Sequence, residues 1–359
     1  MKAAVLYEAK KPLVVEDIEI EEPKRGEVLV KVAAAGACHS DLHFIEGSWP
    51  YPLPVVVGHE GAGTVERVGE GVTLVQPGDH VILTWVAPCG LCRNCVRGKP
   101  YLCSASQTVA MKDGTSRLKK GDQKVNHMLG VSSFAEYLVA HETAVVKIRE
   151  DAPLDKVALI GCAVTTGVGA VVNTAKVEMG SSVAVFGCGG VGLNVVQGAN
   201  LAGASKIIAI DVLDNKLEVA KQLGATHLVN ASKDDPVRKV REITGGGADY
   251  SFEVVGIPEL VTQAFDAVAP GGTAVMVGMP PIGAPLTINS MGLFMGKALR
   301  GAYYGSARVR VDMPALVDLY MAGKLKLDEL ITRTYSLEGA NDAFEAMKKG
   351  EVARGVIKF

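Results

Sequence analysis

One glycine-rich segment constrains the fold of this 359-residue chain more than any other. The run Gly187-Cys188-Gly189-Gly190-Val191-Gly192 follows an apolar stretch at 182–186 and opens a helix-compatible segment that reaches Ala204. A second apolar stretch then closes on Asp211, which lies 19 residues after Gly192. A strand, a glycine turn, a helix, a strand and an acid in this order predict a βαβ unit that binds a dinucleotide.

This segment also predicts how the dinucleotide is held. The glycines allow the backbone to approach a pyrophosphate, and the helix N-terminus offers unpaired N–H groups and a positive dipole. Asp211 is placed to accept hydrogen bonds from the adenosine ribose hydroxyls, and its charge would repel a 2′-phosphate. NAD is therefore favoured over NADP. The alternative is a glycine turn that only permits tight packing.

The rest of the chain divides into two kinds of pattern. Up to about residue 155, short alternating stretches punctuated by Gly and Pro predict a compact β-rich domain. Between 182 and 303, apolar stretches alternate with helix-compatible segments, which predicts a parallel sheet with helices on both faces. After it, 313–325 and 337–349 are expected to be helical, and 355–359 to form a final strand. The clearest strands of the first part are expected at 3–6, 27–32, 63–68 and 80–83.

The composition excludes several classes of protein. The 37 Lys and Arg against 39 Asp and Glu lack the basic excess of nucleic-acid binders, and 48% hydrophobic residues argue against disorder. The odd count of seven cysteines excludes a complete disulfide framework, and the start of the chain lacks a secretory signal pattern, so we expect a cytoplasmic protein. The charge-free stretch 267–296 is long enough for a membrane span, but its prolines and glycines favour a buried strand with loops. We expect neither a membrane nor a nucleic acid as partner.

Four of the cysteines lie in one loop with the spacing C-x2-C-x2-C-x7-C: Cys89, Cys92, Cys95 and Cys103. Four thiolates from one loop suit a closed, structural zinc site, which would pin a segment of little apolar content. Bacterial ferredoxins begin with the same three cysteines, but their fourth follows after three residues and precedes a proline. Here Ser104 follows the fourth cysteine, so the spacing favours zinc over an iron–sulfur cluster or unliganded thiols.

A second set of metal-ligating side chains is scattered along the chain. Cys38, His59 and Cys162 would form a site with three protein ligands and an open fourth position, which can act as a Lewis acid. Spacing alone does not establish that these residues meet. Taken singly, each cysteine is more typical of a small buried hydrophobic residue than of a metal ligand, and a satisfied core side chain is an alternative for the histidine.

Several longer motifs contain these residues, and together with the glycine run and the cysteine quartet they are highly specific. They are Gly36-Ala37-Cys38-His39-Ser40-Asp41, Gly58-His59-Glu60-Gly61-Ala62-Gly63, Val75-Gln76-Pro77-Gly78-Asp79-His80-Val81, and Gly161-Cys162 with Thr166-Gly167. By these motifs the chain resembles, essentially from end to end, the zinc-containing alcohol dehydrogenases of the medium-chain dehydrogenase/reductase family.

The resemblance implies an α/β fold of two domains. A β-rich, GroES-like catalytic domain that binds zinc is expected at 1–163 and 305–359, and a Rossmann domain with a doubly wound parallel sheet that binds NAD at 164–304. It further implies an NAD-dependent zinc alcohol dehydrogenase (EC 1.1.1.1). Such an enzyme oxidises primary alcohols, with allylic or benzylic alcohols as an option, by reversible hydride transfer from a zinc-bound alkoxide.

The same resemblance assigns roles around the catalytic zinc, which is the first of two zinc ions expected per chain. Cys38, His59 and Cys162 would be its ligands, and Asp41 would orient His59. Ser40 and His43 would carry the released proton to solvent, since a histidine accepts a proton near neutral pH. Glu60 lies near this metal in the family, where it either tunes the site or has a purely structural role.

Cofactor and substrate contacts are implied in the same way. Beside the glycine run and Asp211, the residues expected at the dinucleotide are His39, Thr166, Lys216, Val255, Val277, Met279 and Arg354. His39 stands where many animal members have arginine, so we expect looser and more pH-dependent pyrophosphate binding. Trp49 and Trp85 align with family positions that line the substrate pocket, and core packing is the alternative for both.

Other functions stay open. Asp113-Gly114-Thr115-Ser116-Arg117 also resembles the glutathione-dependent formaldehyde dehydrogenases, but Gln107 stands where those enzymes have the arginine that binds the glutathione carboxylate. A nucleotide- and zinc-binding relative without turnover is a second alternative, which the complete set of ligands and relay residues disfavours. The long loop from Cys103 to Tyr137 resembles dimeric members, so a homodimer is favoured over a tetramer.

Overall fold

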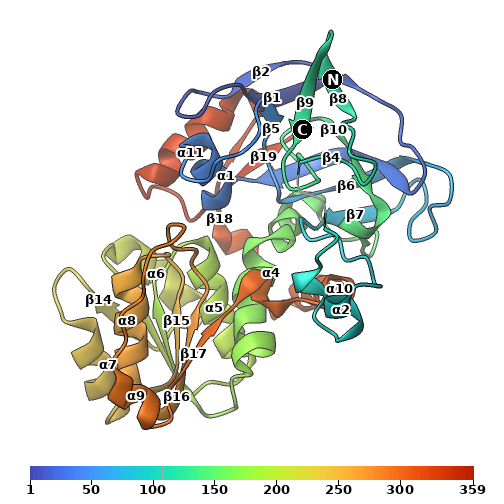
Figure 1. The fold of residues 1–359 in the computed structure, drawn as a ribbon. Helices are drawn as coiled ribbons and strands as arrows, with labels where there is room; N and C mark the ends of the chain where they lie inside the picture. The colour runs from blue at the N-terminus through green and yellow to red at the C-terminus, as the bar shows by residue number, and fades with distance from the viewer. Residues whose placement is uncertain (107–108) are drawn as a thin grey trace. The chain divides into compact units, whose positions relative to one another are not determined.

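The computed structural model describes residues 1–106 and 109–359, and the chain forms two compact units (Figure 1). Unit 1 contains Met1–Cys162 and Arg308–Phe359, and unit 2 contains Ala163–Ala307. The chain thus leaves unit 1 after Cys162 and returns to it at Arg308. Each unit is described below by itself.

Unit 1 is built mainly on two sheets, which follow from the alternating apolar stretches of its sequence. The first has the order β2 (Val14–Asp17), β1 (Lys2–Leu6), β5 (Val55–Val56), β9 (Gln123–His127), β8 (Leu118–Lys120) and β3 (Glu19–Ile20). The second has the order β11 (Val145–Lys147), β7 (His80–Leu83), β6 (Gly61–Val68), β4 (Glu27–Gly36), β19 (Arg354–Lys358) and β18 (Ile331–Tyr335), and β10 (Tyr137–His141) also pairs with β4. The strands expected near the start of the chain are confirmed.

The end of the chain completes the second sheet. Strand β19 pairs antiparallel with β4, with Val356 opposite Gly36, so a segment more than 300 residues away in sequence lies beside β4. The described helices of unit 1 are α1 (His39–Ile45), α2 (Arg93–Val96), α3 (Leu154–Val157), α10 (Val309–Met321) and α11 (Ala340–Lys348). The helix expected at 313–325 begins four residues earlier, and the one at 337–349 opens with a 3-10 turn, Leu337–Gly339.

Unit 2 contains one parallel sheet. Its order is β14 (His227–Asn230), β13 (Lys206–Asp211), β12 (Ser182–Phe186), β15 (Ala248–Glu253), β16 (Val268–Met276) and β17 (Ala298–Gly301). From β12 the chain moves outward to β13 and β14, then returns to β15 on the other side of β12 and moves outward again. The expected doubly wound α/β fold is confirmed, and the switch in direction lies between β12 and β15.

Helices connect these parallel strands. Right-handed crossovers place α5 (Gly190–Leu201) and α6 (Asp214–Gln222) on one face, and α7 (Pro236–Thr244) and α8 (Pro258–Ala267) on the other, as Figure 1 shows. Helix α4 (Ala163–Gly169) packs against α5. The short helix α9 (Ser290–Phe294) was not expected from the sequence, which is uncharged there and carries no amphipathic period.

The uncharged stretch 267–296 contains β16 and α9, so the expected strand with loops is present. Among the described residues, no single helix has the length and apolar composition to cross a membrane. One bent pair, Leu154–Gly161 with Ala163–Ala175, meets those criteria jointly.

A buried histidine in unit 1 makes stability depend on pH. His127 is fully buried, and its Nε2 accepts a hydrogen bond of 3.1 Å from the backbone N–H of Arg117. Burial, together with the positive charges of Arg117 and Lys124, lowers the pKa of His127 to about 3. A histidine in the unfolded chain has a pKa of about 6.5. The stabilisation that comes from burying neutral His127 is therefore complete above pH 6.5 and is lost as the pH falls toward 3.

We expect His127→Gln, which keeps a hydrogen-bond acceptor but does not titrate, to flatten the acid side of the stability profile. Between pH 6.5 and 5.0 the wild type should lose about 2 kcal/mol more unfolding free energy than the variant. Urea unfolding of both proteins at each pH measures the difference in their unfolding free energies. The contributions of all other titrating groups are the same in both proteins and cancel in this difference. Parallel profiles would show that His127 does not control this pH dependence.

Candidate metal centres and dinucleotide site

Four potential metal ligands come together in the interior of unit 1. The ligand atoms of Cys38, His59, Glu60 and Cys162 all lie within 4.8 Å of one another, and all four residues are buried. Three of them are the expected ligands of the catalytic zinc. The structure thus brings together residues that are up to 124 positions apart in the sequence.

Strand register explains this assembly. Ala35 at the end of β4 lies opposite Gly61 at the start of β6, and the Gly36 N–H donates to the Glu60 carbonyl at 3.0 Å. Cys38, two positions after β4, is therefore held close to His59 and Glu60, which immediately precede β6. Cys162 follows a 3-10 turn, Ala158–Gly161, that packs on β4, β6 and β7.

Asp41 orients two of these ligands. From the first turn of α1 its Oδ1 accepts the His59 Nδ1–H at 2.8 Å, and its Oδ2 accepts the Cys38 backbone N–H at 3.2 Å. Burial raises the pKa of Asp41, although its interactions with His59 oppose that shift. With Nδ1 as the donor, the imidazole presents Nε2 to the cluster, which is the tautomer a metal ligand needs.

The donor set fits zinc. His59 Nε2 lies 3.3 Å from Cys162 Sγ, where tetrahedral coordination with ordinary Zn–N and Zn–S bonds would separate two such atoms by about 3.6 Å. Two thiolates and an imidazole match the nitrogen and sulfur ligands of catalytic zinc sites, which keep one position for water or substrate.

Arg354 completes the surroundings of this cluster. Arg354 is only 4% exposed, and its guanidinium forms an ion pair with the Glu60 carboxylate. The family resemblance implies that Arg354 lies at the dinucleotide, and it did not predict this pairing, because the two residues are 294 positions apart. Its contact with a dinucleotide remains a prediction, whereas its position beside Glu60 is observed.

The expected relay and pocket residues lie around the same centre. Ser40 and His43, both half-buried, are three residues apart on α1 and so share one face of that helix. The ring of Trp49 lies 4.6 Å from that of His43, and the ring of Trp85 lies edge-on to His59 at 6.4 Å. Both tryptophans also pack against core clusters of unit 1. Their positions are therefore compatible with lining the substrate pocket and with packing in the core.

The cysteine quartet forms a second cluster in unit 1. Cys89, Cys92, Cys95 and Cys103 bring their sulfurs within 4.8 Å of one another, and the Cys92 and Cys103 sulfurs lie 3.9 Å apart. Tetrahedral zinc with Zn–S bonds near 2.3 Å would place them about 3.8 Å apart. The backbone N–H groups of Cys95 and Ser104 lower the pKa of Cys92 to about 5, whereas burial, and then the hydrogen bond with Cys92, raise the pKa of Cys95 to about 12. The quartet therefore fits a closed zinc site.

The glycine run of unit 2 forms the expected tight turn between β12 and α5. Gly189 is the N-cap of α5, whose first N–H groups have no partner carbonyl within the helix. A side chain at Gly192 would meet the Gly187 carbonyl oxygen at 1.9 Å, so only glycine fits there. This turn leaves backbone groups at the carboxyl edge of the sheet available to an anion.

Asp211 ends β13 beside this turn, as expected. Its Oδ2 accepts the Cys188 N–H at 2.8 Å and its Oδ1 accepts the Leu213 N–H at 3.1 Å. The carboxylate therefore anchors the glycine turn as well as facing solvent in part. Lys216 is half-buried on α6, and Thr166 lies on α4 next to Gly167, which packs closely on Val191 of α5. His39 is exposed at the start of α1 in unit 1.

The remaining expected cofactor residues follow β15 and β16. Val255 is 48% exposed and Met279 is 47% exposed, whereas Val277 is half-buried. A buried carboxylate that the sequence analysis missed, Glu253, lies at the end of β15 and binds the backbone beside them. An acidic residue that closes an apolar strand was the available signal, as it was at Asp211.

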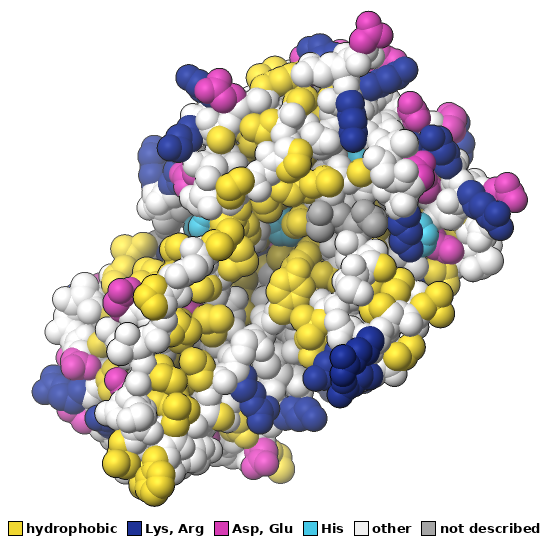
Figure 2. Space-filling view, viewed as in Figure 1, with side chains coloured by type: hydrophobic (Ala, Val, Ile, Leu, Met, Phe, Trp, Pro, Cys, Tyr) yellow, Lys and Arg dark blue, Asp and Glu magenta, His cyan; other side chains and the backbone are white. Residues whose placement is uncertain are grey.

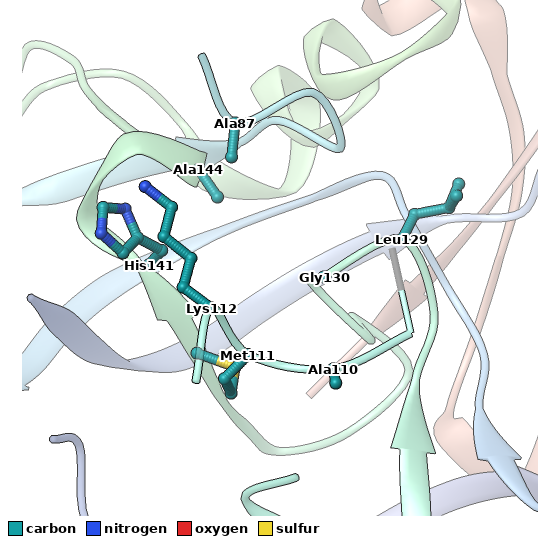
Figure 3. A pocket seen from close by; sticks show the side chains of 8 residues that line it. All are labelled: Ala87, Ala110, Met111, Lys112, Leu129, Gly130, His141 and Ala144. Carbon is teal, nitrogen blue, oxygen red and sulfur yellow. The ribbon is translucent and has the colours of Figure 1, made fainter. Parts of the chain in front are cut away.

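One pocket of unit 1 is lined mostly by apolar residues, with Lys112 and His141 close together at one end (Figure 3). Burial, and then the charge of Lys112, lower the pKa of His141. None of the predicted site residues lines this pocket. Gln107, which bears on glutathione recognition, lies outside the described residues. The lining residues are Ala87, Ala110, Met111, Lys112, Leu129, Gly130, His141 and Ala144.

Two family models match the chain. Residues 24–150 match the alcohol dehydrogenase GroES-like domain, and residues 190–322 match the zinc-binding dehydrogenase domain. The first lies within unit 1, and most of the second lies within unit 2.

Individual relatives match over almost the whole length. The chain is 44% identical to alcohol dehydrogenase class-3 of Dictyostelium discoideum, covering 99% of this chain and 97% of that protein. It is also 44% identical to S-(hydroxymethyl)glutathione dehydrogenase of Paracoccus denitrificans, covering 100% and 99%. The solved structure of benzyl alcohol dehydrogenase from Acinetobacter calcoaceticus superposes with a TM-score of 0.95 at 38% identity, covering 100% and 99%.

Proposed function

Because the chain belongs to the zinc-containing alcohol dehydrogenases of the medium-chain dehydrogenase/reductase family, we propose that it oxidises primary alcohols to aldehydes with NAD, benzylic and allylic alcohols among them. The buried cluster of Cys38, His59 and Cys162 carries this proposal, because its donor atoms fit a catalytic zinc with a position left for substrate. The benzyl alcohol dehydrogenase of similar structure supports the benzylic substrates.

The residues of unit 1 take complementary roles in this proposal. Zinc at the cluster would polarise the substrate hydroxyl as a Lewis acid, and NAD would accept the hydride. Asp41 holds His59 in the tautomer that leaves Nε2 free. Ser40 takes the hydroxyl proton and His43, which is half-buried on the same helix, passes it to solvent. The quartet holds the second, structural zinc.

The residues of unit 2 bind the cofactor in this proposal. The glycine turn and the N-terminus of α5 receive the pyrophosphate, and Asp211 receives the adenosine ribose and disfavours a 2′-phosphate. Lys216 and Thr166 lie on the helices beside the turn. Val255, Val277 and Met279 line the nicotinamide end.

NADH formation with a series of short, long, allylic and benzylic alcohols tests the substrate class. The proposal predicts activity with primary and benzylic alcohols in the absence of glutathione. A second candidate, glutathione-dependent formaldehyde oxidation, is favoured by the names of the relatives at 44% identity. Activity with formaldehyde that appears only when glutathione is added, together with no activity on benzyl alcohol, would replace the first function by the second.

Trp85 is proposed to limit the size of the substrate. Since its ring lies edge-on to His59, Trp85→Ala should open space beside the metal centre and shift kcat/KM toward bulkier alcohols by about tenfold relative to ethanol. Trp49→Ala, which removes the ring beside His43, provides the matched comparison. An unchanged ranking of alcohols in the Trp85 variant would place that ring in the core alone.

We also propose a cytoplasmic homodimer. Apolar side chains gather over α9 and the loop before it in unit 2 (Figure 2). Phe294 is 83% exposed and Ile282 is 77% exposed, and β17 next to α9 is an edge strand of the sheet. Exposed apolar side chains beside an open strand edge are typical of an interface with another chain.

A further inference from the structure

A buried carboxylate lies at the point where the sheet of unit 2 changes direction. Glu253 is the last residue of β15, is fully buried, and lies opposite Phe186, the last residue of β12. Ligands of doubly wound sheets bind outside the carboxyl ends of the strands at this switch point. Glu253 is therefore placed directly beneath the expected dinucleotide site, although it is too deeply buried to contact a ligand itself.

Glu253 ties two turns to each other. Its Oε1 accepts hydrogen bonds of 2.7 Å from the N–H groups of both Val255 and Gly256. Its backbone carbonyl accepts the N–H groups of Val277 at 2.7 Å and Gly278 at 3.0 Å. The side chain of Glu253 thus fixes the turn after β15, and its backbone carbonyl fixes the turn after β16. These turns carry three of the residues expected at the dinucleotide.

The turn after β15 fits closely between its neighbours. Gly256 adopts a φ of +91°, and a side chain there would meet the Met279 carbonyl oxygen at 2.5 Å. On the other side, a side chain at Gly187 would meet Cγ2 of Val255 at 2.5 Å. A small movement of the 255–256 turn would therefore displace either the glycine turn or the 277–279 segment.

Burial of the second carboxylate oxygen of Glu253 costs free energy of folding. Oε2 of Glu253 is buried, and it has no hydrogen-bond partner among the residues that the structure describes. Burial raises the pKa of Glu253, while the N–H groups of Gly256 and Val255 lower it. An apolar side chain would avoid the cost of an unsatisfied buried oxygen but would leave two backbone N–H groups without their acceptor.

The direction in which the dinucleotide crosses the sheet decides which half of the cofactor lies over the turns that Glu253 contacts. Asp211 ends β13, on one side of β12, and is expected at the adenosine ribose, while the glycine turn after β12 is expected at the pyrophosphate. The other half of the cofactor must continue to the opposite side, over the ends of β15 and β16. Those are the two turns that Glu253 joins.

We propose that Glu253 is a positioning residue for the nicotinamide half of NAD, holding the turns at 255–256 and 277–278 in the shape that receives the nicotinamide ring. The inference rests on the proposed function, since it requires that unit 2 binds NAD. It adds to that function a residue that acts through the backbone and not by contact with the cofactor.

Binding of NADH and of ADP-ribose, which lacks the nicotinamide ring, tests this inference by isothermal titration calorimetry. We expect Glu253→Leu to weaken NADH binding about tenfold while ADP-ribose affinity stays within about twofold of wild type. Glu253→Asp, whose carboxylate is set back by one methylene, disturbs the 2.7 Å geometry of both hydrogen bonds and should give a smaller selective loss in the same direction. Glu253→Gln, which keeps the Oε1 acceptor, should bind NADH within about twofold of wild type.

The outcomes separate this inference from the proposed function. Equal weakening of both ligands in the Leu and Asp variants, or no weakening of either, would overturn the positioning role. A wild-type protein that binds neither NADH nor ADP-ribose would instead overturn the proposed function. Because Glu253→Asp retains the buried charge, it keeps the test valid even where Glu253→Leu does not fold.

Discussion

Cys38→Ala is expected to reduce NAD-dependent oxidation of benzyl alcohol at least about 1,000-fold, because the Lewis-acid contribution of a metal is worth several kcal/mol of transition-state stabilisation. The side chain is one of three buried donors in a compact cluster, and alanine leaves only His59 and Cys162 beside Glu60. Metal analysis should show two zinc ions per wild-type chain and one in the variant. Steady-state kinetics and elemental analysis of the same preparations check both expectations.

NADH binding is the control for this variant. Cys38 is not among the residues expected at the dinucleotide, so the affinity for NADH should stay within about threefold of wild type. A variant that keeps two zinc ions per chain and undiminished activity would contradict the assignment of Cys38 to the catalytic metal. Loss of NADH binding along with activity would indicate unfolding and not the loss of a ligand.

Asp211→Ala is expected to change the cofactor preference at least about 100-fold, measured as the ratio of kcat/KM for NAD to kcat/KM for NADP. Loss of hydrogen bonds to a charged acceptor costs about 1.5–3 kcal/mol of NAD binding, and the repulsion of a 2′-phosphate disappears at the same time. The Asp211 carboxylate also accepts the N–H groups of Cys188 and Leu213, so part of the loss for NAD reflects a looser glycine turn.

Two further variants separate these effects. Asp211→Asn removes the charge but keeps an acceptor for the Cys188 N–H, so it should relieve the rejection of NADP with a smaller loss for NAD. Asp214→Ala removes an equal charge from an exposed carboxylate that pairs with Lys233, and it should leave the preference unchanged. An Asp211→Asn variant that still rejects NADP would show that the charge at Asp211 does not select the cofactor.

Much of the fold of unit 2 was predictable, because its determinants are local. The strand at 182–186, the glycine turn and Asp211 occupy one continuous segment, and each has its own physical requirement: an apolar buried strand, a turn closed to side chains at Gly192, and an acid at a strand end. The cysteine quartet was equally predictable, since its four cysteines lie in one loop. Local patterns of this kind do not depend on tertiary register.

The cluster of Cys38, His59 and Cys162 was predictable only through the family resemblance. Cys38 and His59 meet because β4 and β6 pair with Ala35 opposite Gly61, a register that spacing in the sequence does not reveal. The ion pair of Glu60 with Arg354 was missed for the same reason, because it depends on the return of β19 to β4. Glu253 was missed because its partners are backbone N–H groups, so its place at the end of an apolar strand was the one signal in the sequence.

Direct hydride transfer from the alcohol carbon to NAD is tested most directly with benzyl alcohol that carries two deuterium atoms at that carbon. Mass spectrometry of the NADH formed should show one deuterium per molecule in the nicotinamide ring and the deuterated aldehyde in equal amount. NADH without deuterium, or aldehyde formation without NADH, would contradict zinc-assisted hydride transfer as the function of this protein.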